Sequence, residues 1–258
     1  MNSKISIIFE KKPFKYLLVT CLLLISTNGL FAQRKHILFI GDSITDGNWG
    51  GGGAKPSRER NHLDQNHLFG SGFMYLSAAY YMGKFPGYNL SFFNRGISGN
   101  TLEDLSARWQ SDVLDLNPDI LSILIGTNDV AKFLESKDKS FDEVVWSKKY
   151  SELIIKTVKE YPNVKILLCT PFVSPGARVE NYDRYADLIK VLSIEIHKLA
   201  AKHHVTLVDF HSMYADLIVD NPQTSPDYWL WDGVHPTAAA HQKMAELWRT
   251  TAEAYIIN

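Results

Sequence analysis

The sequence predicts an α/β fold in which a parallel five-stranded sheet lies between two layers of helices, a three-layer α/β/α sandwich. Two observations support this prediction. Short apolar runs of strand length alternate along the chain with longer amphipathic stretches, which is the pattern of a parallel sheet whose strands are joined through helices. With 258 residues, of which 45% are hydrophobic and 21% charged, the chain has the composition of one ordinary globular domain with a sizeable core.

The predicted strands are five short apolar runs. In chain order they are HILFI at 36–40, LSFF at 90–93, ILSILI at 120–125, KILLC at 165–169 and TLV at 206–208. Each is followed by a stretch with the apolar periodicity of a helix, and these predicted helices span 75–82, 102–114, 142–161, 182–203 and 237–256. Because a helix lies between each pair of successive strands, a doubly wound parallel sheet is the simplest arrangement.

Residues 1–32 have the three-part pattern of a secretory signal peptide. Several lysines precede an apolar run at 16–26, and Ala32 supplies a small residue at the expected cleavage point. The run is shorter than the roughly 20 apolar residues that a membrane-spanning helix needs, so we expect cleavage near Ala32 and no stable membrane insertion afterwards. The pattern predicts a secreted or periplasmic protein whose folded domain spans residues 33–258.

Charge and cysteine content argue against several classes of partner. Residues 1–32 hold four lysines and one glutamate of the chain's 27 basic and 28 acidic residues, so their removal leaves a net charge of about −4, which disfavours nucleic-acid binding. Cys169 is then the only cysteine, and its apolar neighbours predict a buried side chain without a disulfide. No recognisable metal-ligand spacing is present, and we expect no metal and no cofactor.

Four short polar blocks follow predicted strands or precede the last helix. GDSIT contains Ser43, NRGISGNT contains Gly99, GTND contains Asn128, and WDGVHP contains Asp232 and His235. In an open parallel sheet, ligands bind just beyond the carboxyl ends of the strands. We therefore expect these five residues to meet at one edge of the sheet.

The residue types in these blocks are those that acyl transfer through a serine requires. Ser43 can act as the nucleophile if His235 takes its proton, and Asp232 can hold the imidazole in the correct tautomer. The backbone N–H groups of Ser43 and Gly99 and the side-chain amide of Asn128 can stabilise the oxyanion. Singly, such residues are more often turn or helix-cap residues, so the prediction rests on their combination.

The four blocks, in this order, resemble the SGNH (GDSL) hydrolase superfamily, whose name lists the Ser, Gly, Asn and His that they carry. GISGNT, the residues up to GTNDV, and WDGVHP are similar to the acetyl-xylan and acetyl-xylooligosaccharide esterase branch. The resemblance covers roughly residues 36–250. It implies a flavodoxin-like SGNH fold, Ser43, Asp232 and His235 as catalytic residues, and an oxyanion hole built from Ser43, Gly99 and Asn128. The polar, glycine-rich segment 47–72 departs from that branch.

By this resemblance, the protein is expected to be a secreted serine esterase that removes O-acetyl groups from a xylan-type polysaccharide or oligosaccharide. Its partner would be an acetylated carbohydrate. Two alternatives remain open: a lysophospholipase or long-chain acyl esterase of the same fold, and a non-catalytic carbohydrate-binding protein. The sequence also leaves open whether the chain forms a homo-oligomer.

Several residues near the blocks have alternative interpretations. Trp231, directly before the aspartate of WDGVHP, can shape the pocket wall or stack on a sugar ring of the substrate. Asp42 and Asp129 are expected to accept hydrogen bonds from backbone N–H groups in tight turns. Arg95 and Arg108 are expected to form surface contacts or ion pairs, with a role in substrate binding as the alternative.

Overall fold

The computed structural model describes residues 34–47, 69–136 and 141–257. The predicted signal peptide and most of the glycine-rich segment 47–72 lie outside the described residues, so those two predictions stay predictions. Within the described residues, no helix is long and apolar enough to cross a membrane.

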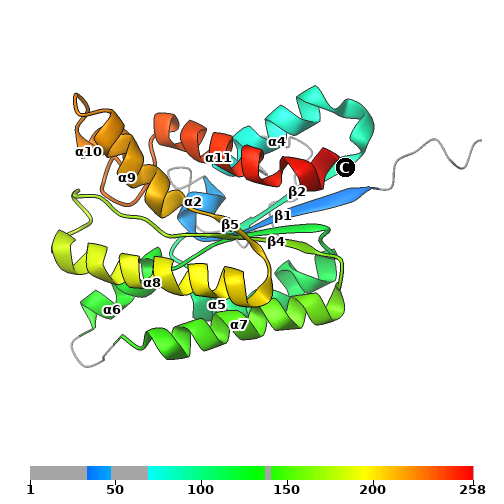
Figure 1. Cartoon of the computed structure of the whole chain (residues 1–258), viewed down its shortest axis with the longest axis horizontal. Coiled ribbons are helices and arrows are strands. Elements are labelled where there is room, and N and C mark those ends of the chain that lie inside the picture. Colours follow the sequence, from blue (N-terminus) through cyan, green and yellow to red (C-terminus); the bar gives the residue numbers. More distant parts are fainter. Residues whose placement is uncertain (1–33, 48–68, 137–140, 258) are drawn as a thin grey trace, which may run out of the picture. The chain divides into compact units, whose positions relative to one another are not determined.

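Five parallel strands form one sheet (Figure 1). They are β1 (Lys35–Gly41), β2 (Leu90–Gly96), β3 (Ile120–Leu124), β4 (Lys165–Cys169) and β5 (Thr206–Val208). The strand order is β2-β1-β3-β4-β5, which is the flavodoxin-like order of a doubly wound sheet. This confirms the predicted fold class.

Helices cover both faces of this sheet, as Figure 1 shows. One face carries α4 (Phe73–Lys84), α9 (Phe210–Asp220), α10 (Pro226–Trp229) and α11 (Ala238–Ile257). The other carries α5 (Leu102–Asp112), α6 (Thr127–Glu135), α7 (Glu143–Glu160) and α8 (Tyr182–His203). The short helices are α2 (Ser43–Asp46), η2 (Pro86–Tyr88) and η3 (Leu114–Leu116).

The alternation of side chains along β1 builds a separate hydrophobic core on each face of the sheet. Ile37 and Phe39 enter the core beneath α4 and α11, whereas Leu38 and Ile40 enter the core beneath α5, α7 and α8. All four side chains are fully buried, because successive residues of a strand point to opposite faces. Burial of both faces explains why this strand reads as a continuous apolar run.

The fully buried indole of Trp248, on α11, connects the last helix to the middle of the sheet. Its ring packs 4.5 Å from the ring of Phe39, and its Nε1 donates a hydrogen bond of 2.9 Å to Ser122 Oγ on β3. The Ser122 hydroxyl also contacts Cys169 Sγ at 3.5 Å. Cys169 is buried and free, as predicted, and burial raises the pKa of its thiol to about 12.

Two helices that the sequence analysis did not predict, α6 and α9, also begin just beyond strands. Helix α9 starts at Phe210, where the side chain of Asp209 caps it by accepting a hydrogen bond of 3.1 Å from Ser212 N–H. Helix α6 starts directly after β3, at Thr127. Both helices begin at the edge of the sheet where the strands end. Three residues of the GTND block, Thr127 to Asp129, therefore lie in the first turn of α6 rather than on a loop.

Candidate active site

Ser43 lies at the edge of the sheet where β1 ends, as the first residue of α2. Asp42 caps this helix, since its Oδ1 accepts a hydrogen bond of 2.9 Å from Ile44 N–H. Gly47 ends the helix in a left-handed conformation. The first residue of a helix has no partner for its N–H within that helix, so the turn presents both the hydroxyl and the N–H of Ser43 at the sheet edge.

His235 and Asp232 complete a chain of hydrogen bonds with Ser43. The Oγ of Ser43 lies 2.9 Å from His235 Nε2, and His235 Nδ1 lies 2.7 Å from Asp232 Oδ2. The three side chains are buried. The serine and the histidine are 192 residues apart in the sequence, so the fold brings them together. In this arrangement the imidazole can take the serine proton while the carboxylate stabilises the resulting charge.

The carboxylate of Asp232 is held in its ionised form. Burial alone would raise its pKa, but hydrogen bonds from the N–H groups of His235 and Val234 and from the His235 ring outweigh burial and lower the pKa. The two backbone bonds, of 2.8 and 3.0 Å, reach Oδ1, while Oδ2 accepts from the imidazole. A carboxylate fixed at both oxygens can orient the histidine ring.

Gly99 and Asn128 also line the space in front of Ser43. Gly99 has φ +79°, which an L side chain rarely adopts, and no atom lies within 4 Å of where a Cβ would be. Asn128, on α6, donates from Nδ2 to Asn100 O at 3.1 Å and to Asp42 Oδ2 at 3.4 Å. The structure thus brings all five predicted site residues to one edge of the sheet.

Two aspartates support these loops: Asp42 is buried, and Asp129 is partly buried. Asp129 accepts hydrogen bonds from Leu102 N–H at 3.1 Å and from Trp146 Nε1 at 2.9 Å, and Asp42 accepts from a backbone N–H as described above, so both make the expected backbone contacts. Burial raises the pKa of Asp42 to about 7 and that of Asp129 to about 6. Asp42 therefore carries a proton over much of the acid range.

Arg108 ties the loops after β1 and β2 together. Its guanidinium donates to Arg95 O at 2.8 Å, to Gly41 O at 3.1 Å and to the side chain of Asn100 at 2.8 Å. It also forms an ion pair with Asp112 at 2.8 Å. The ion-pair interpretation is therefore confirmed for Arg108, which holds the loop that contains Gly99.

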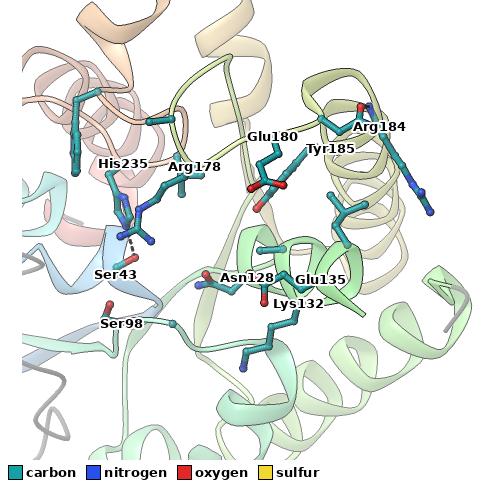
Figure 2. Close-up of a pocket in the computed structure, with 17 residues that line it drawn as sticks. Ser43, Ser98, Asn128, Lys132, Glu135, Arg178, Glu180, Arg184, Tyr185 and His235 are labelled. Carbon is teal, nitrogen blue, oxygen red and sulfur yellow. Dashed lines mark hydrogen bonds between the residues drawn. The ribbon is translucent and has the colours of Figure 1, made fainter. Parts of the chain in front are cut away.

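A pocket of about 700 Å³ opens beside Ser43 and His235 (Figure 2). Its wall is rich in charged side chains, which the sequence analysis did not single out: Lys132, Glu135, Arg178, Glu180 and Arg184. Three of the five lie between the end of β4 and the first turn of α8. These three could have been predicted from the sequence, because ligands bind beyond the carboxyl ends of strands and this segment follows β4. Among the described residues, no group of three or more His, Cys, Asp or Glu could hold a metal ion.

Trp231 forms part of the pocket wall and remains half exposed, at 49%. Its ring stacks on the His235 imidazole with 6.0 Å between ring centroids and an interplanar angle of 22°. Trp229, two residues earlier, is buried and donates from Nε1 to Thr224 Oγ1 at 3.1 Å. The two tryptophans therefore differ: Trp229 packs the core, whereas Trp231 offers an open aromatic surface beside the histidine.

Comparisons with known proteins agree with this geometry. Residues 39–243 match the GDSL-like lipase/acylhydrolase family. The chain is 32% identical over 221 residues to an acetylxylan esterase of Geobacillus stearothermophilus, covering 82% of this chain and 90% of that protein.

Two solved structures share the fold. A protein of Parabacteroides merdae assigned as a GDSL-like lipase superposes with a TM-score of 0.75 and 31% identity, over 86% of this chain and 97% of the other. A catalytic mutant of an acetylxylan esterase from Geobacillus stearothermophilus gives a TM-score of 0.68 and 26% identity, over 86% and 95% of the two chains.

Proposed function

The chain belongs to the GDSL-like lipase/acylhydrolase family and is a carboxylic ester hydrolase, and from this premise we propose that it removes O-acetyl groups from xylan-type polysaccharide or oligosaccharide. The observation that carries the proposal is the charged pocket beside Ser43. Charged and hydrogen-bonding side chains suit the hydroxyl groups of a sugar, whereas a long acyl chain requires an apolar groove. The acetylxylan esterase named above, similar over most of its length, supports the same substrate class.

In the proposed first step, Ser43 Oγ attacks the acetyl carbonyl while His235 Nε2 takes the hydroxyl proton. Asp232, ionised and hydrogen-bonded to the ring, stabilises the imidazolium that forms. The negative charge that develops on the carbonyl oxygen would be stabilised by the N–H groups of Ser43 and Gly99 and by the amide of Asn128. Each such donor typically contributes about 3 kcal/mol in acyl-transfer enzymes.

In the second half of the proposed cycle, His235 returns its proton to the sugar oxygen as the bond between that oxygen and the carbonyl carbon breaks. The sugar leaves with a free hydroxyl, and the acetyl group stays on Ser43. Water then attacks the acetyl-enzyme, with His235 again taking a proton, and acetate leaves as Ser43 regains its hydrogen. No cofactor takes part in this scheme.

The solved structures of the Geobacillus esterase support the choice of residues. They include catalytic mutants with alanine in place of a serine, a histidine or an aspartate. That aspartate and histidine are three positions apart, as Asp232 and His235 are here. A further mutant replaces the tryptophan directly before that aspartate, the position that Trp231 holds in this chain. Because the Trp231 ring is half exposed in the pocket wall beside His235, the proposed scheme has it stack on a sugar ring of the substrate.

We further propose that the protein is exported, on the basis of the signal-peptide pattern at 1–32. Mass spectrometry of the protein recovered from the periplasm or medium of its host would then find an N-terminus near Gln33. Recovery only in the cytoplasm, with Met1 retained, would contradict export.

Acetate release tests the proposed reaction. Wild type and Ser43→Ala would be incubated with acetylated xylooligosaccharides and, in parallel, with a long-chain acyl ester. We expect wild type to release acetate from the sugar and Ser43→Ala to lose this activity while keeping its melting temperature. Ser111→Ala, which alters an exposed serine on α5 outside the pocket, is the matched control and should behave as wild type.

Each other outcome points to a different function. Preference for the long-chain ester would identify a lipolytic enzyme of the same fold. Binding of xylooligosaccharide without hydrolysis of either ester would favour a carbohydrate-binding protein and contradict the proposed mechanism.

A further inference from the structure

The loop between β4 and α8, residues 170–181, is fastened to the turn that carries Asp232. Ser174 N–H donates to Gly233 O at 2.9 Å, and Arg178 N–H donates to Asp232 O at 2.9 Å. The two segments approach so closely that a Cβ on Gly176 would lie 2.2 Å from Gly233 N. The position of Arg178 relative to the Asp232 carboxylate is therefore fixed by backbone contacts.

The Arg178 side chain shares an oxygen atom with the catalytic histidine. Its Nε lies 3.0 Å from Asp232 Oδ2, the same atom that accepts from His235 Nδ1. The side chain is 65% exposed, although its partner carboxylate is only 2% exposed. Within the described part of the chain, its two Nη groups have no hydrogen-bond partner, so they remain available to a ligand.

The mechanism of ester cleavage fixes which part of the substrate, the acyl group or the leaving alcohol, lies next to this guanidinium. The carbonyl oxygen must face the donors of Gly99 and Asn128, whereas the leaving alcohol must lie against His235 Nε2, from which it receives its proton. Figure 2 shows Arg178 beside His235, with Asn128 apart from both. Arg178 is thus on the alcohol side of the ester.

We infer that Arg178 is a specificity-determining residue, whose Nη groups donate hydrogen bonds to hydroxyl oxygens of the leaving alcohol next to the ester. A guanidinium that pairs with a carboxylate through Nε still presents the other N–H groups of its planar fork to a ligand, which a lysine cannot reproduce. An acetate ester whose alcohol carries free hydroxyls gains these bonds, and one without them does not. This inference rests on the proposed deacetylation of sugars for its natural substrate, but not for its test.

The test compares kcat/KM of wild type, Arg178→Ala and Arg178→Lys on three acetate esters. Two have hydroxyls beside the ester, acetylated xylooligosaccharide and glycerol monoacetate, and the third, 4-nitrophenyl acetate, has none. A hydrogen bond to a charged group typically changes binding by a factor of about 10 or more. We expect Arg178→Ala to lower kcat/KM on the hydroxylated esters about 10-fold more than on the aryl ester, and Arg178→Lys to lower it by an intermediate factor.

Arg249→Ala is the matched control, because this arginine lies on α11 and its guanidinium packs over Tyr80, outside the pocket. It should match wild type on all three esters. If Arg178→Ala lowers kcat/KM equally on all three, the arginine acts only through Asp232 and the inference is wrong; an unchanged enzyme also overturns it. Should wild type cleave only glycerol monoacetate and the aryl ester, the proposed xylan substrate fails while the Arg178 comparison still decides its role.

Discussion

The buried carboxyl of Asp42 makes the stability of this protein depend on pH in a calculable way. Asp42 is 1% exposed, and burial is the main reason that its pKa rises from 3.8 to about 7, with the nearby charges of Asp129 and Asp46 adding to it. Asparagine has nearly the same shape and keeps an oxygen that can accept from Ile44 N–H. Asp42→Asn therefore removes the titration with little change in packing.

The sign and size of the effect follow from the two pKa values. Between about pH 4 and pH 7 the folded protein retains the Asp42 proton that the unfolded chain has lost, so the free energy of unfolding of wild type falls as the pH rises. A pKa of about 7 in place of 3.8 corresponds to about 4 kcal/mol, because a tenfold change in proton affinity is worth about 1.36 kcal/mol. We expect Asp42→Asn to gain about this much stability relative to wild type as the pH rises from about 4 to about 8.

Urea unfolding at several pH values across this range measures the difference between the two proteins. Asp104→Asn is the control: burial would raise the pKa of Asp104, but hydrogen bonds from Thr101 and Lys132 outweigh burial and lower it. Its stabilising contribution is lost only as the pH falls below about 4, so its difference from wild type should stay constant across the range. A constant difference for Asp42→Asn as well would refute the reasoning, because it would mean that Asp42 is ionised in the folded protein.

Three further substitutions test other parts of the site. Asn128→Ala removes a proposed oxyanion donor, and we expect kcat for acetate release to fall about 10²- to 10³-fold with a melting temperature close to that of wild type. Trp231→Ala removes a half-exposed ring, so KM for acetylated xylooligosaccharide should rise while the free energy of unfolding changes little; an unchanged KM would contradict sugar stacking. Gly176→Ala places a methyl group against the backbone of Gly233. We expect it to lower the free energy of unfolding in urea by about 1–3 kcal/mol and to lower kcat. Wild-type values of both would show that the two segments can separate without cost.

The strands and the long helices could be predicted from the sequence because their burial is visible in the residue pattern. Strand β4 has the predicted bounds, and β1 extends the predicted 36–40 by one residue at each end. Strand β2 continues three residues past the predicted 90–93, through Asn94, whose buried amide donates to Thr45 O at 3.0 Å and to Phe69 O at 2.9 Å. A polar residue satisfied by distant carbonyls looks like the end of a strand when only its neighbours are considered.

Only part of the site is visible in short stretches of the sequence. Ser43, Asn128 and His235 follow from short blocks because each block has a local structure and a chemistry of its own. Arg178 has no such local signal: its role depends on contact with Asp232, which requires the close approach of two glycines far apart in the chain. Helices α6 and α9 were missed for a related reason, since tertiary packing rather than a long apolar period sets their place.

The distance in sequence between Ser43 and His235 has a consequence for biosynthesis. A nascent chain that has passed residue 124 already contains the three adjacent strands β2, β1 and β3 and the serine turn. The imidazole and its carboxylate emerge from the ribosome only some 110 residues later, at about 5–20 residues per second. Until they emerge, Ser43 lacks the general base and the carboxylate that the proposed mechanism requires, so the incomplete chain cannot carry out acyl transfer through this serine.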